Sequence, residues 1–261
     1  MSGKRSAASW MVGMLLAALS AGVAQSSNSA TRGPLLSAEE VVHRLEEKNQ
    51  ERAGALRQFQ GTRIYRMQYR GFPSDRDAEM IVQVSYRSPD NKEFTVISEN
   101  GSQFIINHVF KKLLEGEREA ANEENQRLTA LSRENYDFRM DGYQNTPSGA
   151  QYVLEVAPKS RNRFLYRGKI WVDANDFAVT RIQAEPAKNP SIWIKKTDVE
   201  HRYEKVDGFW LPAENHSESF LRLGGRATLT IEYKDYKIVA ARPRDGITSS
   251  DQGLVMARIA R

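Results

Sequence analysis

The four histidines of this sequence are the side chains best suited to exchange protons near neutral pH. His43, His108, His201 and His216 are scattered along the chain. The sequence contains no His-x-x-x-His, His-Glu-x-x-His or Gly-x-Ser-x-Gly pattern, so the usual signatures of metal and nucleophile sites are missing. We therefore predict that the protein is not an enzyme, holds no metal ion and needs no cofactor. A hydrolase built from scattered aspartates is the alternative.

A second group of residues suits the binding of an apolar chain. Methionine and aromatic side chains alternate with polar ones along several segments, and methionine repacks readily around variable ligands. Trp171, Trp193 and Trp210 belong to the same aromatic set. These residues could instead form an ordinary packed core. The predicted apolar cavity is lined by Tyr65, Met67, Tyr69, Met80, Val82, Val84, Phe94, Val96, Phe110, Leu113, Leu114, Leu229 and Ile231.

The composition narrows the class of protein. The 261 residues include no cysteine, which excludes disulfides, thiolate metal sites and acylation of the chain itself as a bacterial lipoprotein. The net charge of +5 is mild, and basic residues are interspersed with acidic ones. This is the pattern of an ordinary soluble surface, so nucleic acid is not an expected partner.

The N-terminus has the layout of a secretory signal peptide. Lys4 and Arg5 precede an apolar stretch from Ala7 to Ala24, where small residues favour cleavage. We predict a signal peptide over residues 1–24, a flexible leader over 25–36, one domain over 37–238 and a loose tail over 239–261. The protein is then secreted to the periplasm. An uncleaved membrane anchor is the alternative, at the lower limit of spanning length.

Periodicity predicts one long helix followed by strands. Ser37 and Glu40 form a capping box, and apolar residues then recur at helical spacing, so a helix is expected over about 38–58. Alternation from Tyr65 onward predicts an antiparallel meander that ends, after Asn100-Gly101, in a strand at Gln103–Ile106. Two further helices are expected near 107–120 and 122–134.

The second half is rich in strands separated by turn signals such as Asp207-Gly208. The predicted fold is α+β and mainly β. A curved antiparallel sheet of about eleven strands forms an incomplete β-barrel, covered by two or three helices. Such a sheet leaves a cavity if side chains do not fill it. Phe110 to Leu114 then belongs either to a lid that moves or to a fixed core helix.

Several segments resemble the LolA-like superfamily of periplasmic lipoprotein carriers, with its relatives LolB and the N-terminal domain of RseB/MucB. The segments are Tyr152–Lys159, Ile170–Asp173 with Phe177–Ile182, Gly208–Pro212 and the strand Leu229–Tyr236. The resemblance implies a half-barrel whose concave apolar face accepts acyl chains. It implies a carrier of lipid or acylated lipoprotein, with a possible inner- or outer-membrane protein partner. The alternative is an RseB-like sensing module that docks on a membrane protein, for example through residues 240–261.

Overall fold

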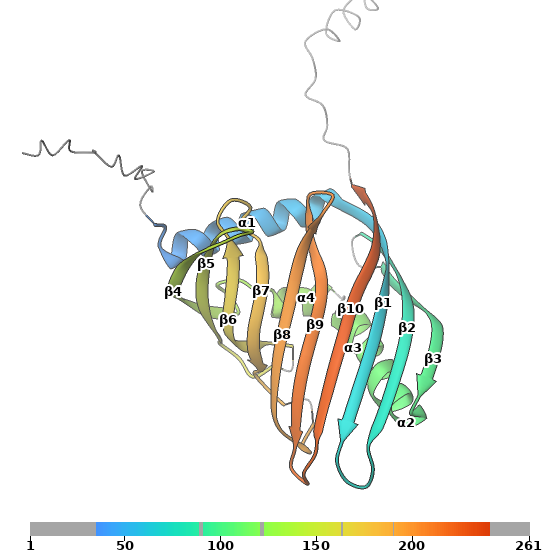
Figure 1. Ribbon diagram of the computed structural model, residues 1–261. Coiled ribbons are helices and arrows are strands. Elements are labelled where there is room, and N and C mark those ends of the chain that lie inside the picture. The colour runs from blue at the N-terminus through green and yellow to red at the C-terminus, as the bar shows by residue number, and fades with distance from the viewer. Residues whose placement is uncertain (1–34, 89–90, 121–122, 163, 190, 241–261) are drawn as a thin grey trace, which may run out of the picture. The chain divides into compact units, whose positions relative to one another are not determined.

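One antiparallel sheet of ten strands organises the computed structural model, which describes residues 35–88, 91–120, 123–162, 164–189 and 191–240 (Figure 1). The predicted signal peptide, nearly all of the leader and the tail from residue 241 lie outside the described residues. The strands run in the order β3-β2-β1-β10-β9-β8-β7-β6-β5-β4. Their bounds are β1 (Leu56–Arg70), β2 (Arg76–Arg87), β3 (Asn91–Gly101), β4 (Tyr136–Thr146), β5 (Gly149–Pro158), β6 (Tyr166–Asp173), β7 (Val179–Pro186), β8 (Ile194–Val206), β9 (Phe209–Leu221) and β10 (Arg226–Ala240).

The sheet is not closed, because its edge strands β3 and β4 have no partner on their outer sides among the described strands. The chain between these two edges forms α2 (Gln103–Ile105), the π-helical turn η1 (Ile106–Phe110), α3 (Lys111–Ala120) and α4 (Glu123–Thr129). These helices lie behind the sheet in Figure 1. The predicted class is confirmed: a mainly β incomplete barrel with helices on one face.

The first helix, α1 (Ala38–Ala55), begins where the capping box predicted. The Ser37 side chain accepts a hydrogen bond from the Glu40 amide at 3.2 Å, which satisfies one of the free donors at the helix start. The helix ends at Ala55 rather than near residue 58, because Leu56 already opens β1 and pairs with Ala240 at the end of β10.

The described residues form ten strands, close to the number expected, and one local prediction was wrong. Gln103–Ile106 is helical, not a strand, because β3 already ends at Gly101 opposite Ala78 and the chain leaves the sheet there. The predicted turn at Asp207-Gly208 is correct. Both residues have positive φ, 48° and 85°, as a two-residue hairpin loop requires.

Candidate functional site

The buried apolar side chains fall into two separate clusters on the helix-covered face of the sheet. In the first, which we call the Leu45 cluster, α1 packs on β4–β7. In the second, the Phe110 cluster, α2, η1 and α3 pack on β1, β2 and β10. The Leu45 cluster comprises Val41, Val42, Leu45, Tyr136, Tyr152, Leu154, Val156, Leu165, Ile170, Val172, Phe177, Ile182 and Ala184. The Phe110 cluster comprises Tyr65, Ala78, Met80, Val82, Val84, Ile105, Ile106, Phe110, Leu114 and Ile231.

Most of the residues predicted to line a cavity meet in the Phe110 cluster. Seven of them are buried there: Tyr65, Met80, Val82, Val84, Phe110, Leu114 and Ile231. Four more are partly buried against it: Met67, Phe94, Leu113 and Leu229. They come from four strands and two helical elements, so the fold brings together side chains that the sequence separates by up to 166 positions between Tyr65 and Ile231.

Two of the thirteen predicted cavity residues lie apart from this cluster. Val96 is paired with Val82 in the sheet but is 40% exposed on the edge strand. The Tyr69 hydroxyl donates a hydrogen bond to the Phe72 carbonyl at 2.5 Å, toward the β1–β2 turn. The three tryptophans considered with this set also lie outside both clusters.

The helical cover contacts the sheet through apolar side chains. Ile105, Ile106, Phe110 and Leu114 are at most 5% exposed, and the rings of Phe110 and Tyr65 lie 5.8 Å apart. A π-helical turn spans Ile106–Phe110, at the point where the cover meets the sheet. Such turns are rare and often mark functional positions in helices.

A partly buried charge cluster joins the same cover to the sheet. Glu117 of α3 accepts a hydrogen bond from Arg63 of β1 at 2.5 Å and another from Lys92 of β3 at 2.9 Å. The Arg63 side chain is 7% exposed, and its guanidinium lies 4.9 Å from the centre of the Tyr233 ring. One carboxylate therefore holds two cations, and sequence reasoning missed this cluster.

Burial and charge oppose each other in this cluster. Burial alone would raise the pKa of the Glu117 carboxyl, but Lys92 and Arg63 outweigh it and hold that pKa below its usual value. Burial lowers the pKa of the Lys92 ammonium, which Glu117 partly offsets and the Arg63 charge lowers further. Burial also raises the pKa of the Tyr65 hydroxyl to about 12. Glu117 is thus ionised at neutral pH, and Tyr65 is protonated.

Between the two clusters, polar side chains interrupt the apolar face of the sheet. Ile182 of the Leu45 cluster pairs with His201, His201 with Asn215, and Asn215 with Ile231 of the Phe110 cluster. Residues paired across strands point to one face, so His201 and Asn215 lie between the clusters. Burial lowers the pKa of His201, which favours its neutral form. The face is therefore apolar at both sides, and His201, Asn215 and Ser217 form a short polar band between them, next to Val199 and Tyr203 of the Leu45 cluster side.

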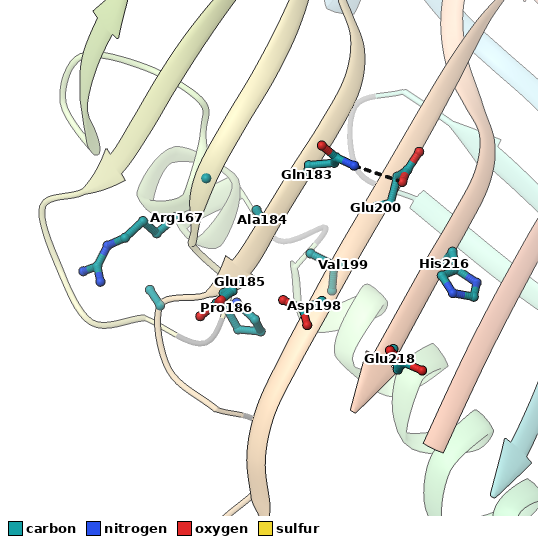
Figure 2. A pocket seen from close by; sticks show the side chains of 12 residues that line it. Arg167, Gln183, Ala184, Glu185, Pro186, Asp198, Val199, Glu200, His216 and Glu218 are labelled. Atoms are coloured by element: carbon teal, nitrogen blue, oxygen red, sulfur yellow. Dashed lines mark hydrogen bonds between the residues drawn. The ribbon is translucent and has the colours of Figure 1, made fainter. Parts of the chain in front are cut away.

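A pocket of about 650 Å³ lies over β6–β9 (Figure 2). Glu200 pairs with Gln183 on one side and with His216 on the other. Gln183 is adjacent in sequence to Ala184, which belongs to the Leu45 cluster. Because successive residues of a strand point to opposite faces, these three side chains lie on the face opposite the clusters. The lining is Arg167, Gly168, Gln183, Ala184, Glu185, Pro186, Ala187, Asp198, Val199, Glu200, His216 and Glu218.

The acidic groups of this pocket are paired with cations. Lys196 bridges Glu185 and Asp198, Arg226 contacts Glu218, and Arg181 and Arg202 contact Glu200. Burial would raise the pKa of Glu200, but hydrogen bonds from Arg202, Arg181 and Gln183 hold it below its usual value. A carboxylate held ionised in this way is poorly suited to donate a proton.

Two further observations concern the described residues as a whole. Among them, no group of three or more His, Asp or Glu side chains is placed so that it could bind a metal ion. Within the same ranges, no helix combines the length and the apolar character needed to cross a bilayer.

Comparison with known proteins finds similarity at the level of structure. No protein-family model matches the sequence, and no curated protein matches it. A domain described as an outer membrane lipoprotein-sorting protein domain from Vibrio parahaemolyticus aligns with a TM-score of 0.43 and 11% identity, over 84% of this chain and 98% of that one. A LolA superfamily protein from Nitrosomonas europaea aligns with a TM-score of 0.37 and 14% identity, over 84% of this chain and 100% of that one. MucB aligns with a TM-score of 0.27 and 12% identity, over 76% of this chain and 92% of that one.

The proteins that the sequence resembles are therefore among the solved structures that align with this chain.

Proposed function

We propose that the protein is a periplasmic carrier that binds an acyl chain of a lipid or lipoprotein on the helix-covered face of its sheet. The observation that carries the proposal is the cover itself. Ile105, Ile106, Phe110 and Leu114 project from the α2–η1–α3 segment onto an apolar sheet surface that an acyl chain could occupy in their place. The Phe110 cluster is thus the proposed acyl site, and the segment 103–118 is its lid.

The free energies gained by burying the lid side chains and by burying an acyl chain are compatible with reversible binding. Burying the four apolar side chains of the lid is worth roughly 8 kcal/mol, at about 2 kcal/mol each. A chain with about 14 methylenes gains roughly 11 kcal/mol when it is buried, at about 0.8 kcal/mol per methylene. The acyl chain is therefore favoured over the lid by roughly 3 kcal/mol before the cost of ordering the chain is counted. A lid that competes for the site would moderate affinity and provide a route to release.

The polar band on β8 and β9 suits the polar end of the same ligand. A carboxylic ester buried in an apolar site needs hydrogen-bond donors. His201, Asn215 and Ser217 lie on the covered face and carry such groups. The acyl chain would then lie in the Phe110 cluster, with its ester toward the band.

The test is mass spectrometry of organic extracts from protein purified out of the periplasm without detergent, next to a mock purification. Enrichment of phospholipid or acylated peptide is the expected result and identifies the cargo class. The same extraction from a Met80→Gln variant is the matched control, because a polar side chain at this fully buried position disfavours an apolar ligand. An empty wild-type protein would refute the carrier and favour a regulatory module that docks on a membrane protein.

A further inference from the structure

Four large apolar side chains are exposed on three turns at one end of the sheet. Phe72 lies in the β1–β2 turn and is 83% exposed. Ile192 and Trp193, in the β7–β8 loop, are 78% and 57% exposed, and Leu223 in the β9–β10 turn is 77% exposed. The β1–β2 and β9–β10 hairpins end together at the bottom of Figure 1. We call residues 71–75, 187–195 without 190, and 222–225 the loop-tip surface.

Hydrogen bonds from Arg222 and a close approach of two glycines hold the three turns side by side. The Arg222 amide donates to the Trp193 carbonyl at 2.8 Å, and the Arg222 guanidinium donates to the Ile192 carbonyl at 2.9 Å. Gly71 and Gly225 pack so closely that a Cβ added to Gly71 would lie 2.7 Å from the Gly225 Cα. Glycine is therefore required where the hairpins meet. The turns are fixed together, yet their four apolar side chains remain exposed.

The same surface carries cations that lack an acidic partner. Lys188, Lys195 and Arg222 are exposed, and no ion pair joins them to a carboxylate among the described residues. The cations at the neighbouring strand ends differ, because Arg226 is paired with Glu218 and Lys196 with Asp198. Asp75 is the carboxylate of this surface, and it lies 3.8 Å from Arg70 at the end of β1. The loop-tip surface thus combines apolar tips with an excess of positive charge.

We propose that the loop-tip surface docks on an anionic phospholipid bilayer. Phe72, Ile192, Trp193 and Leu223 enter the interface, and the three free cations face lipid phosphates. Tryptophan favours the membrane–water boundary, and lysine and arginine are attracted to anionic lipid. The free cations are the reason to choose a bilayer over a protein partner, since a negatively charged surface of wide extent satisfies all of them at once.

Docking by this surface is independent of what the covered face holds, because none of its four apolar side chains belongs to either cluster. A protein that binds no acyl chain could still dock, and a carrier could fail to dock. The two proposals are therefore tested separately.

The experiment is co-sedimentation of the full chain with vesicles of phosphatidylcholine alone and of three parts phosphatidylcholine to one part phosphatidylglycerol. We expect sedimentation with the anionic vesicles. Trp193→Ser combined with Leu223→Ser should weaken it at least about tenfold, since two interfacial anchors are lost. Ile97→Ser combined with Val239→Ser is the matched control, as these side chains are 61% and 56% exposed but lie outside the loop-tip surface. The control should bind like the wild type.

A variant that lacks two of the cations completes the test. Lys188→Gln with Lys195→Gln should weaken binding to the anionic vesicles and leave the small binding to neutral vesicles unchanged. All variants share the same terminal segments, so any contribution of those segments cancels in the comparison. The proposal is overturned if the wild type does not bind anionic vesicles, or if the Trp193/Leu223 variant binds them as well as the control does.

Discussion

The two halves of the sheet are covered in different ways. On the β4–β7 side, α1 is a regular helix of 18 residues whose buried side chains Val41, Val42 and Leu45 join an extensive cluster. On the β1–β3 side, the cover is broken into a three-residue helix, a π-helical turn and a helix of ten residues. The first cover is continuous, and the second is segmented where it touches the sheet.

The polar contacts of the two covers differ as well. Arg52 of α1 donates to two backbone carbonyls, those of Asp176 and Phe177, at 2.9 Å each. The α3 helix is held instead by ion pairs between side chains: two cations share Glu117, and Lys111 lies 3.3 Å from Glu99 of β3. Backbone carbonyls stay in place, whereas an ion pair between side chains can separate and be solvated. Under the proposed function, we expect the cover over β4–β7 to stay in place and the cover over β1–β3 to move.

The largest expected effects come from truncating one buried residue in each cover. Phe110→Ala and Leu45→Ala should each lower the free energy of unfolding by about 3 kcal/mol, because both side chains are fully buried. Urea denaturation measures this. Only Phe110→Ala should also alter acyl binding: a weaker lid competes less, so a fluorescent fatty acid should bind about tenfold more tightly.

The Leu45→Ala variant is the control for this pair, because it leaves the α2–η1–α3 lid intact. Its affinity for the same fatty acid should equal that of the wild type. Equal changes of affinity in the two variants would show that the covers do not differ in this way.

A smaller effect is expected from the charge cluster. Glu117→Gln removes the carboxylate and leaves two neighbouring cations without it, which should lower the free energy of unfolding by about 2 kcal/mol. Glu46→Gln is the counterpart on α1. It loses the ion pair with Arg133, whose side chain is 56% exposed, and should destabilise the protein less than Glu117→Gln does. Thermal unfolding of both variants distinguishes these results, and an equal loss would contradict the special role of Glu117.

The smallest effect concerns the polar band between the clusters. Burial lowers the pKa of His201, so the folded protein resists protonation there while the unfolded chain takes up the proton. Stability should therefore fall as the pH drops below the ordinary histidine pKa of about 6.5. His201→Asn should reduce this loss between pH 8 and the acidic range, measured as urea midpoints of both proteins. An identical pH dependence in the two proteins would show that His201 does not contribute.

The sequence was sufficient to predict the fold class because its signals are local. The capping box at Ser37, the alternation along β1, β2 and β10 and the turn at Asp207-Gly208 each act over a few residues. The same locality explains the errors. Phe104-Ile105-Ile106 is a short apolar run after Asn-Gly, which is compatible with either a strand or a helix. Only its position beyond the edge of the sheet makes it helical.

The candidate site could be predicted in part. Eleven of the thirteen predicted side chains lie in or against one cluster: eight alternate within strands, and Phe110, Leu113 and Leu114 belong to helical elements. The charge cluster gave no such signal, because Glu117 lies 54 positions from Arg63 and 25 from Lys92. Neither apolar periodicity nor a motif connects residues that meet only through tertiary packing.

Hydrogen exchange with and without palmitic acid tests most directly whether an acyl chain displaces the lid over the Phe110 cluster. Amide exchange followed by mass spectrometry reports on both covers in one experiment. We expect palmitic acid to speed exchange in residues 103–118 and to leave residues 38–55 unchanged. Bound palmitic acid with unchanged exchange in residues 103–118, or with faster exchange in residues 38–55, would contradict the proposed acyl site.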